Sequence, residues 1–214
     1  MYLETRLVTS ADKNRVLHFY NAFYRTNEPV DRALALSWPE GWTFYEDSFD
    51  RCTQLPCSMA VYHNNSIVAC ALNAIRDLTA REPTGKNERL YTEKCRAAET
   101  FYAELEKPLN SYARKYPKWF LCDMVCVRPD HYRRGLATKL WLQAVETAEQ
   151  LGCHGIYADA SAIGSQKGLA KLGFETINTL NLARFLHTSG IRMPTVSCDS
   201  LDIEVKLMVR LLRQ

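Results

Sequence analysis

The spacing of hydrophobic residues changes along the chain, and the clearest stretches predict β-structure in its middle. Residues 58–62 and 67–75 are two β-rich runs on either side of the turn His63-Asn64-Asn65-Ser66. They predict a hairpin, because asparagine tolerates the positive φ angles that a tight turn needs. Residues 118–127 form an apolar run that ends at Arg128-Pro129-Asp130. Such a run predicts a buried central strand.

Helical spacing and turn signals predict the elements around this β-structure. Thr9 and Asp12 form a capping-box-like helix start, and Pro29 stops that helix because the residue before a proline avoids helical angles. Residues 38–56 mix aromatic and polar side chains without a clear period, so we expect a loop there. The other expected elements are a strand at 2–8, helices at about 9–25, 30–36, 87–106 and 136–151, a short helix before Gly173, a polar loop at 76–86 and a closing strand at 201–211.

Composition narrows the class of protein. The 214 residues suffice for one domain, and 47% hydrophobic with 24% charged residues predicts a soluble globular protein. Eight cysteines without regular spacing and five scattered histidines lead us to expect neither a disulfide framework nor a metal site. A net charge of +3 is too small to indicate nucleic-acid binding. With no apolar run of about 20 residues and no signal-like start, we expect a cytoplasmic protein without a membrane segment.

The segment after the central strand suits a phosphate. Arg133-Arg134-Gly135-Leu136-Ala137-Thr138 follows that strand and opens a helix whose apolar residues recur until Gly152. A strand, a glycine turn and a helix start together expose backbone N–H groups at the positive end of the helix dipole. A turn that binds nothing and a pair of solvated arginines would explain the same residues equally well.

With this loop, the sequence resembles the GNAT acetyltransferase superfamily, whose acyl-CoA loop has the pattern Q/R-x-x-G-x-G/A. Gly135 and Ala137 match the pattern, whereas its first position falls on Tyr132. Leu172-Gly173-Phe174 matches the Leu-Gly-Phe that commonly ends the fourth helix of these proteins. The resemblance covers nearly the whole chain. It implies an α/β (α+β) GNAT fold, with a mixed central sheet of about seven strands and helices on both faces.

The resemblance also implies a place for acetyl-CoA. The loop would hold the coenzyme phosphates, and the splayed end of the central strand would hydrogen-bond the pantetheine arm through its backbone. The residues concerned are Met124, Val125, Cys126, Val127, Arg133, Arg134, Gly135, Leu136, Ala137 and Thr138. An N–H group near Val125 could also stabilise the negative charge that develops on the thioester oxygen.

Acetylation of an amine needs a proton acceptor, because an alkylammonium with a pKa of roughly 10 has no free lone pair at neutral pH. Many superfamily members protonate the leaving thiolate with a tyrosine, but Leu169 stands at that position. Instead, Ser161 and Ser165 lie four residues apart, so their hydroxyls can share one helix face.

The serine pair and Asn27-Glu28-Pro29 closely resemble insect-type arylalkylamine N-acetyltransferases. Carried over residue by residue, Glu28 is the general base, while Ser161 and Ser165 orient groups or relay a proton to the thiolate. A glutamate at a helix end is more often a solvated charge, and serines beside a helix start are more often caps.

The function implied is transfer of an acetyl group from acetyl-CoA to a small arylalkylamine of the tyramine, dopamine, serotonin and octopamine class. The amine would attack the thioester directly in a ternary complex. Alternatives are acetylation of polyamines or protein amines, and binding of acyl-CoA without turnover. The aromatic cluster at Tyr20, Phe23 and Tyr24 and the acids Glu46 and Asp47 could line an amine pocket, although packing and solvation are their commoner roles. The sequence leaves monomer and dimer open.

Overall fold

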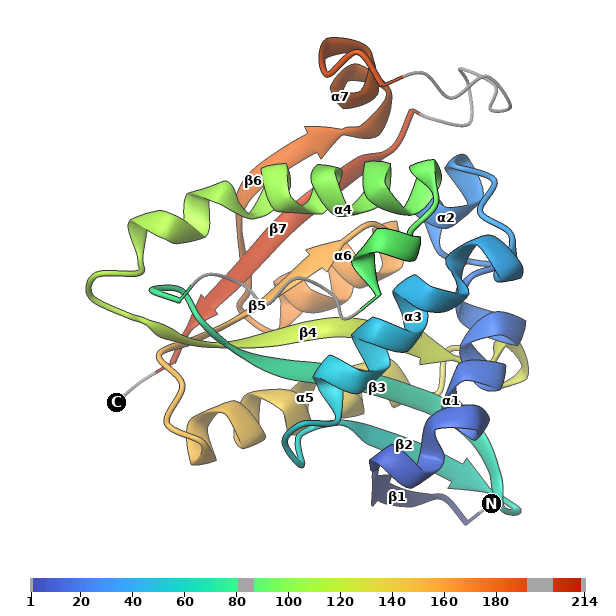
Figure 1. Cartoon of the computed structure of the whole chain (residues 1–214). Helices are drawn as coiled ribbons and strands as arrows, with labels where there is room; N and C mark the ends of the chain where they lie inside the picture. Colours follow the sequence, from blue (N-terminus) through green and yellow to red (C-terminus); the bar gives the residue numbers. More distant parts are fainter. Residues whose placement is uncertain (1, 81–86, 192–201, 213–214) are drawn as a thin grey trace.

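A seven-stranded mixed sheet forms the centre of the molecule (Figure 1). The computed structural model describes residues 2–80, 87–191 and 202–212. The strand order is β1-β2-β3-β4-β5-β7-β6, and β4 and β5 form a parallel pair among otherwise antiparallel neighbours. The strands are β1 (Glu4–Leu7), β2 (Met59–His63), β3 (Ser66–Asp77), β4 (Lys118–Val127), β5 (Gly155–Ala160), β6 (Glu175–Asn181) and β7 (Glu204–Leu211).

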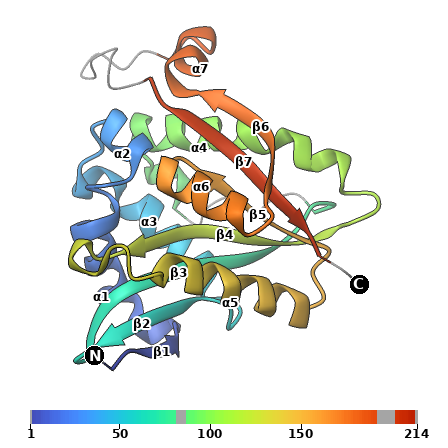
Figure 2. The same cartoon turned by 180° about the vertical axis from the view of Figure 1, so that it is seen from behind.

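Helices cover both faces of the sheet. The helices α1, α3 and α4 lie on the face of the sheet that is turned towards the viewer in Figure 1. The helices α5 and α6 lie on the other face, which is turned towards the viewer in Figure 2. The described α-helices are α1 (Lys13–Phe19), α2 (Pro29–Ala33), α3 (Trp38–Cys52), α4 (Glu93–Glu106), α5 (Leu136–Gln150), α6 (Ile163–Lys171) and α7 (Leu182–Thr188). This arrangement confirms the fold class expected from the sequence. In the described part of the chain, no helix is both long and apolar enough to cross a membrane.

The central strand β4 supplies side chains to both layers, as its continuous apolar pattern predicts. Trp119 and Leu121 pack into the layer under α1, α3 and α4, whereas Phe120 and Cys122 pack into the layer under α5 and α6. Successive side chains of a strand point to opposite faces, so burial of both faces requires an apolar residue at nearly every position.

The predicted hairpin is confirmed as β2 and β3. Asn64 and Asn65 form its turn with φ angles of 49° and 59°, which is the left-handed region that asparagine tolerates. The closing strand is confirmed as β7, although its expected first residue, Leu201, lies outside the described residues. The expected loop at 76–86 was wrong at its start, because β3 continues through Asp77; residues 81–86 also lie outside the described part.

The loop expected at 38–56 is wrong, because Trp38–Cys52 forms the helix α3. A capping box starts this helix: the Glu40 carboxylate accepts hydrogen bonds from the Ser37 amide at 2.8 Å and from the Ser37 hydroxyl at 2.6 Å. Tyr45, Phe49 and Cys52 then bury one face of the helix. The start signal and the buried stripe are both in the sequence, but Pro39, Gly41 and the polar residues along the helix obscure the period.

A gap opens inside the sheet where β4 and β5 separate. The two strands pair only from Trp119 opposite Gly155 to Leu121 opposite Tyr157. Beyond Leu121, β4 remains paired with β3 up to Val127 but has no partner on its β5 side. The separation therefore leaves backbone groups of β4 available to something other than a strand.

Candidate active site

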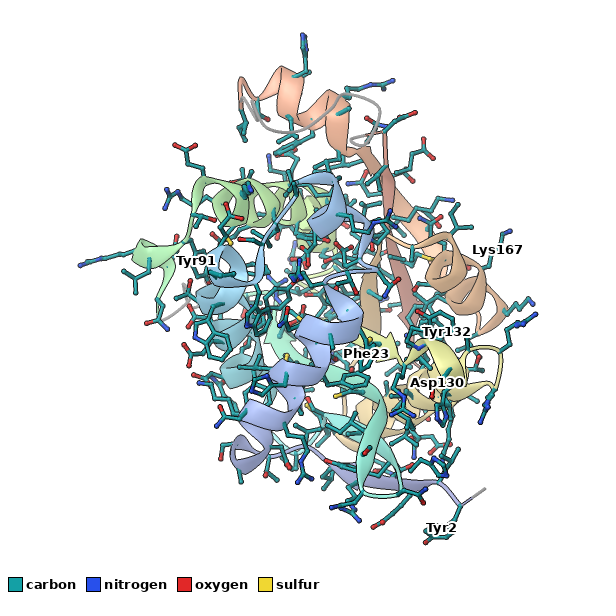
Figure 3. The ribbon with its side chains drawn as sticks, turned by 90° about the vertical axis from the view of Figure 1, so that its right-hand side faces the viewer. Tyr2, Phe23, Tyr91, Asp130, Tyr132 and Lys167 are labelled. Atoms are coloured by element: carbon teal, nitrogen blue, oxygen red, sulfur yellow. The ribbon has the colours of Figure 1, made fainter. Side chains whose placement is uncertain are left out.

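A cavity of about 630 Å³ lies at this gap and brings together residues from distant parts of the sequence. Its walls come from β4, β5, the loop before α5, the start of α6 and the segment after α1. Figure 3 shows the side of the molecule on which β4 ends and labels two lining residues, Phe23 from the N-terminal helical segment and Tyr132 from the loop before α5. A cavity of this size is typical of sites for small molecules and cofactors.

The predicted phosphate loop forms one wall of the cavity. Gly135 caps α5 with a φ of 74°, and a Cβ atom placed on it would meet nothing within 4 Å. Arg133 also has a positive φ, 60°. The first amides of a helix have no acceptor inside the helix, so the start of α5 presents donors and positive dipole to the cavity. This cradle fits a phosphate group of a coenzyme.

The residues expected to hold the coenzyme divide into two groups. Two of them, Met124 and Arg134, do not line the cavity. Met124 is buried, and its carbonyl oxygen accepts a 2.9 Å hydrogen bond from the Tyr20 hydroxyl. Those that do line it are Val125, Cys126, Val127, Arg133, Gly135, Leu136, Ala137 and Thr138.

The backbone of β4 directs amide groups into the gap. The Arg128 amide donates to the Val68 carbonyl oxygen on the β3 side at 2.8 Å. Backbone groups of successive strand residues point to opposite sides, so the amides of Val127 and Val125 point away from β3. They face the side on which β4 has no strand partner. These amides suit the carbonyl oxygens of an extended ligand.

Glu28 is buried at the same cavity, with only 4% of its surface exposed. It caps α2, and its Oε2 atom accepts a 2.6 Å hydrogen bond from the Asp31 amide. Its other oxygen, Oε1, is buried and has no partner in hydrogen-bonding geometry among the described residues. Burial raises the pKa of Glu28, while the nearby Ser161 hydroxyl and the amides of Asp31 and Val30 oppose the rise. A carboxylate of this kind is a suitable proton acceptor.

Ser161 and Ser165 line the cavity together with Glu28. Helix α6 begins at Ile163, and its N-cap residue is Ala162, without a capping hydrogen bond from a side chain. Neither serine therefore has the capping role that is common for serine beside a helix start. The side chains of Glu28 and the two serines come from segments more than 130 residues apart, and the fold brings them to one cavity.

A second, smaller cavity of about 150 Å³ lies beside the first, on the side of α3 and α4. The two cavities share four residues: Tyr24, Glu28, Asp123 and Asp159. Aromatic side chains make up much of the second cavity's wall: Tyr24, Phe44, Tyr45, Tyr91 and Tyr102.

Two candidate acids lie elsewhere. Glu46 and Asp47 line neither cavity: Glu46 pairs with Lys13 at 2.9 Å, and Asp47 accepts hydrogen bonds from Asn87 and Tyr91. They contribute to the structure and do not contact either cavity.

Asp159 belongs to the site, although the sequence analysis did not select it. It is a single acid in the otherwise uncharged strand β5, and it lines both cavities. Its Oδ1 atom is buried without a hydrogen-bond partner among the described residues. An acid inside a buried strand costs free energy, so its position in Gly155–Ala160 was the available signal. No group of three or more His, Cys, Asp or Glu side chains in the described ranges could hold a metal ion.

Comparison with known proteins identifies the family. The sequence model described as the acetyltransferase (GNAT) family matches residues 14–174, which is well over half of the chain. The chain belongs to the acetyltransferase (GNAT) family. GNAT enzymes use acetyl-CoA and an amine substrate.

Solved structures support the same fold. Arylalkylamine N-acetyltransferase 2 from Aedes aegypti is 20% identical, with a TM-score of 0.83 and full coverage of both chains. A Drosophila melanogaster polyamine N-acetyltransferase that forms N-acetylagmatine is also 20% identical, with a TM-score of 0.82 over 99% of this chain and all of that one. The NatC complex bound to a Gag peptide and CoA has a TM-score of 0.60 at 11% identity, with full coverage of both chains.

Proposed function

We propose that this GNAT acetyltransferase transfers the acetyl group of acetyl-CoA to the primary amine of a small arylalkylamine, with Glu28 as general base. The observation that carries the proposal is the position of Glu28, whose unpartnered buried oxygen lies where the cavities meet. The larger cavity, with its phosphate cradle, suits the coenzyme. The smaller cavity, with five aromatic side chains, suits an aryl ring.

The residues of the chain supply the steps of a direct transfer. The amine arrives as an ammonium ion, and Glu28 accepts the proton that it must lose before its nitrogen can attack the thioester carbon. The amides of Val125 and Val127 are available to the coenzyme arm and to the charge that develops on the carbonyl oxygen. Ser161, beside Glu28, orients the carboxylate. Two cysteines, Cys122 and Cys126, line the larger cavity, and burial raises the pKa of both thiols, which disfavours a nucleophilic thiolate and supports direct attack.

A polyamine is the second candidate, and a specific observation favours it. Six carboxyl groups line the smaller cavity against two guanidinium groups. An excess of acids attracts a ligand with more than one positive charge. The acids are Glu28, Asp31, Glu99, Glu106, Asp123 and Asp159, and the two cations are Arg51 and Arg76.

Thiol release from acetyl-CoA tests the proposal directly. We would assay tyramine, dopamine, serotonin, octopamine, agmatine, spermidine and a lysine peptide with the wild-type protein and with Glu28→Gln. We expect turnover of the arylalkylamines and a fall of about 10²–10⁴-fold in kcat for Glu28→Gln, the usual contribution of a positioned base. Glu46→Gln is the matched control, because Glu46 lies outside both cavities.

The remaining outcomes separate the alternatives. Turnover of agmatine and spermidine alone would change the substrate class but keep the role of Glu28. Turnover of the peptide alone would indicate a protein acetyltransferase. Tight binding of coenzyme A with no thiol release from any amine would contradict the proposal and indicate a GNAT protein that binds acyl-CoA without catalysis.

A further inference from the structure

The proposed reaction leaves one role without a residue, namely protonation of the departing thiolate. Leu169 stands at the position where many superfamily members have a tyrosine, and it is 1% exposed at the wall of the larger cavity. A leucine has no proton to give. Among the residues that line the cavity, another group must supply the proton, or the thiolate must take it from water.

Most other proton carriers in the cavity wall are poor acids for this step. Burial raises the pKa of the Cys126 thiol and of the Tyr24 hydroxyl well above their usual values. The serine hydroxyls have a high intrinsic pKa. Asp123 is already engaged in a 2.7 Å ion pair with Arg51.

Asp159 lines both cavities, as Tyr24 and Asp123 do, but of these three residues only Asp159 lies on β5. It lies on β5 at the gap, beyond the last residue of β5 that pairs with β4, and it lines both cavities. It is two residues before Ser161, so the two side chains leave the strand end on the same side. Glu28, beside Ser161, also lines both cavities. Asp159 and Glu28 thus both lie where the two cavities adjoin.

The surroundings of Asp159 favour its protonated form. Burial is the main cause that raises the pKa of Asp159 well above its usual value, and the carboxyls of Glu106 on α4 and Asp123 on β4 raise it further. Arg76 on β3 opposes the rise, but Arg76 also forms an ion pair with Glu106. Burial also raises the pKa of Glu28, but there the Ser161 hydroxyl and the backbone amides of Asp31 and Val30 oppose the rise. Two carboxyl groups with such different surroundings suit the paired roles of base and acid.

We propose that Asp159 is the general acid that protonates the coenzyme A thiolate. Glu28 takes a proton from the substrate ammonium, and the freed nitrogen lone pair forms the C–N bond. The C–S bond then breaks, its electron pair stays on sulfur, and the sulfur takes the proton of the Asp159 carboxyl. After the C–N bond forms, the nitrogen carries a positive charge and gives its second proton to solvent, and a proton from solvent restores Asp159. Glu28 releases the proton it took, so that an ammonium and a thioester give an amide, a thiol and one proton. The inference rests on the proposed function.

Asp159→Asn tests this role. The amide keeps the shape of the side chain but carries no acidic proton, so we expect kcat to fall about 10²–10⁴-fold with little change in the KM for the amine. In the wild type, kcat falls as the pH rises through the pKa of Asp159, because the acid must be protonated. In Asp159→Asn we expect no such decrease of kcat at alkaline pH. Asp159→Glu keeps a carboxyl group, so we expect it to retain part of the wild-type kcat and part of its decrease at alkaline pH.

A second readout does not depend on turnover. Infrared difference spectra of the free wild-type protein and Asp159→Asn at neutral pH should show the carbonyl band of one protonated carboxyl group in the wild type. Asp50→Asn is the control, because Asp50 pairs with Lys13 at 2.8 Å and lies outside both cavities. Thermal unfolding and calorimetric binding of coenzyme A check that each variant is folded.

Three results would overturn the inference. A kcat within about twofold of wild type in folded Asp159→Asn would show that the acid is another group or water. A raised KM for the amine with unchanged kcat would show that Asp159 binds the ammonium and does not protonate the thiolate. Absence of the carbonyl band would show that Asp159 is ionised in the free protein and has no proton to give. If the wild type acetylates no amine in the panel, the proposed function itself is wrong, and the role of Asp159 fails with it.

Discussion

The left-handed backbone at Gly135 offers a test that separates strain from function. An alanine with positive φ costs about 1–2 kcal/mol. The same change also lowers the conformational entropy of the unfolded chain, and this stabilises the folded protein by about 0.4–1 kcal/mol. A Cβ atom at Gly135 would meet nothing within 4 Å, so no steric clash is added to this balance. We therefore expect Gly135→Ala to destabilise the protein by about 1 kcal/mol, or about 2–4 °C in melting temperature for a chain of this length.

Two other glycines provide matched controls. Gly152 has a φ of 66° and open space around it, but it ends α5 and does not line the cavity. Gly164 also has open space and lines the cavity, but it lies in α6 with ordinary helical angles. Gly152→Ala should lose about as much stability as Gly135→Ala, whereas Gly164→Ala should gain about 0.5–1 kcal/mol.

Differential scanning calorimetry and titration with coenzyme A measure the two effects separately. If the start of α5 cradles a phosphate, Gly135→Ala should weaken coenzyme A binding, whereas Gly152→Ala should leave it unchanged despite an equal loss of stability. Equal coenzyme affinity in all three variants and the wild type would refute the cradle. Equal melting temperatures for Gly135→Ala and Gly164→Ala would refute the strain argument.

Three further predictions concern stability. Tyr20→Phe removes the donor that serves two buried carbonyl oxygens at 2.9 and 3.3 Å, and denaturant unfolding should show a loss of about 1–3 kcal/mol. Gly168→Ala would place a Cβ atom 2.5 Å from the Trp141 ring, so it should cost about 1–3 kcal/mol; an unchanged melting temperature would contradict this packing. A hydrogen bond from the Ser37 hydroxyl, and to a smaller extent one from Lys94, lowers the pKa of Glu40 from 4.5 to about 2. The ionised Glu40 carboxylate therefore stabilises the folded protein above pH 4.5, and this stabilisation is lost as the pH falls towards 2. Urea unfolding at several pH values should show a shallower acid loss for Glu40→Gln, and identical slopes would contradict it.

The sequence predicted those elements whose signals are local. The Asn64-Asn65 turn and the apolar run of β4 are such signals, because a tight turn and a strand buried on both faces constrain the residues within them. The helix α3 was missed because Gly41 and Pro39 break its pattern, although Ser37 and Glu40 supply a complete capping box.

The site was predictable only in part. The motifs around Glu28, Ser161 and Ser165 are short and local, and the fold brings all three to one cavity. Asp159 was missed because its importance depends on the separation of two strands and on carboxyl groups from β4 and α4. The wide turn at Tyr20–Tyr24, where the Arg25 amide bonds to the Tyr20 carbonyl oxygen five residues earlier, also has no sequence signal that we can identify.

The separation of β4 from β5 has a consequence for how this protein avoids aggregation. Unpaired strand backbone is normally a liability at the rim of a sheet, where it can recruit a strand from another molecule. Here the part of β4 beyond Leu121, which has no partner on its β5 side, lies in the interior of the sheet, and its residues Val125, Cys126 and Val127 line the cavity. A narrow ligand can reach this edge, but another protein's strand would have to displace β5 or the walls. The fold thus leaves strand backbone unpaired in the interior of the sheet and not at an edge where another molecule could pair with it.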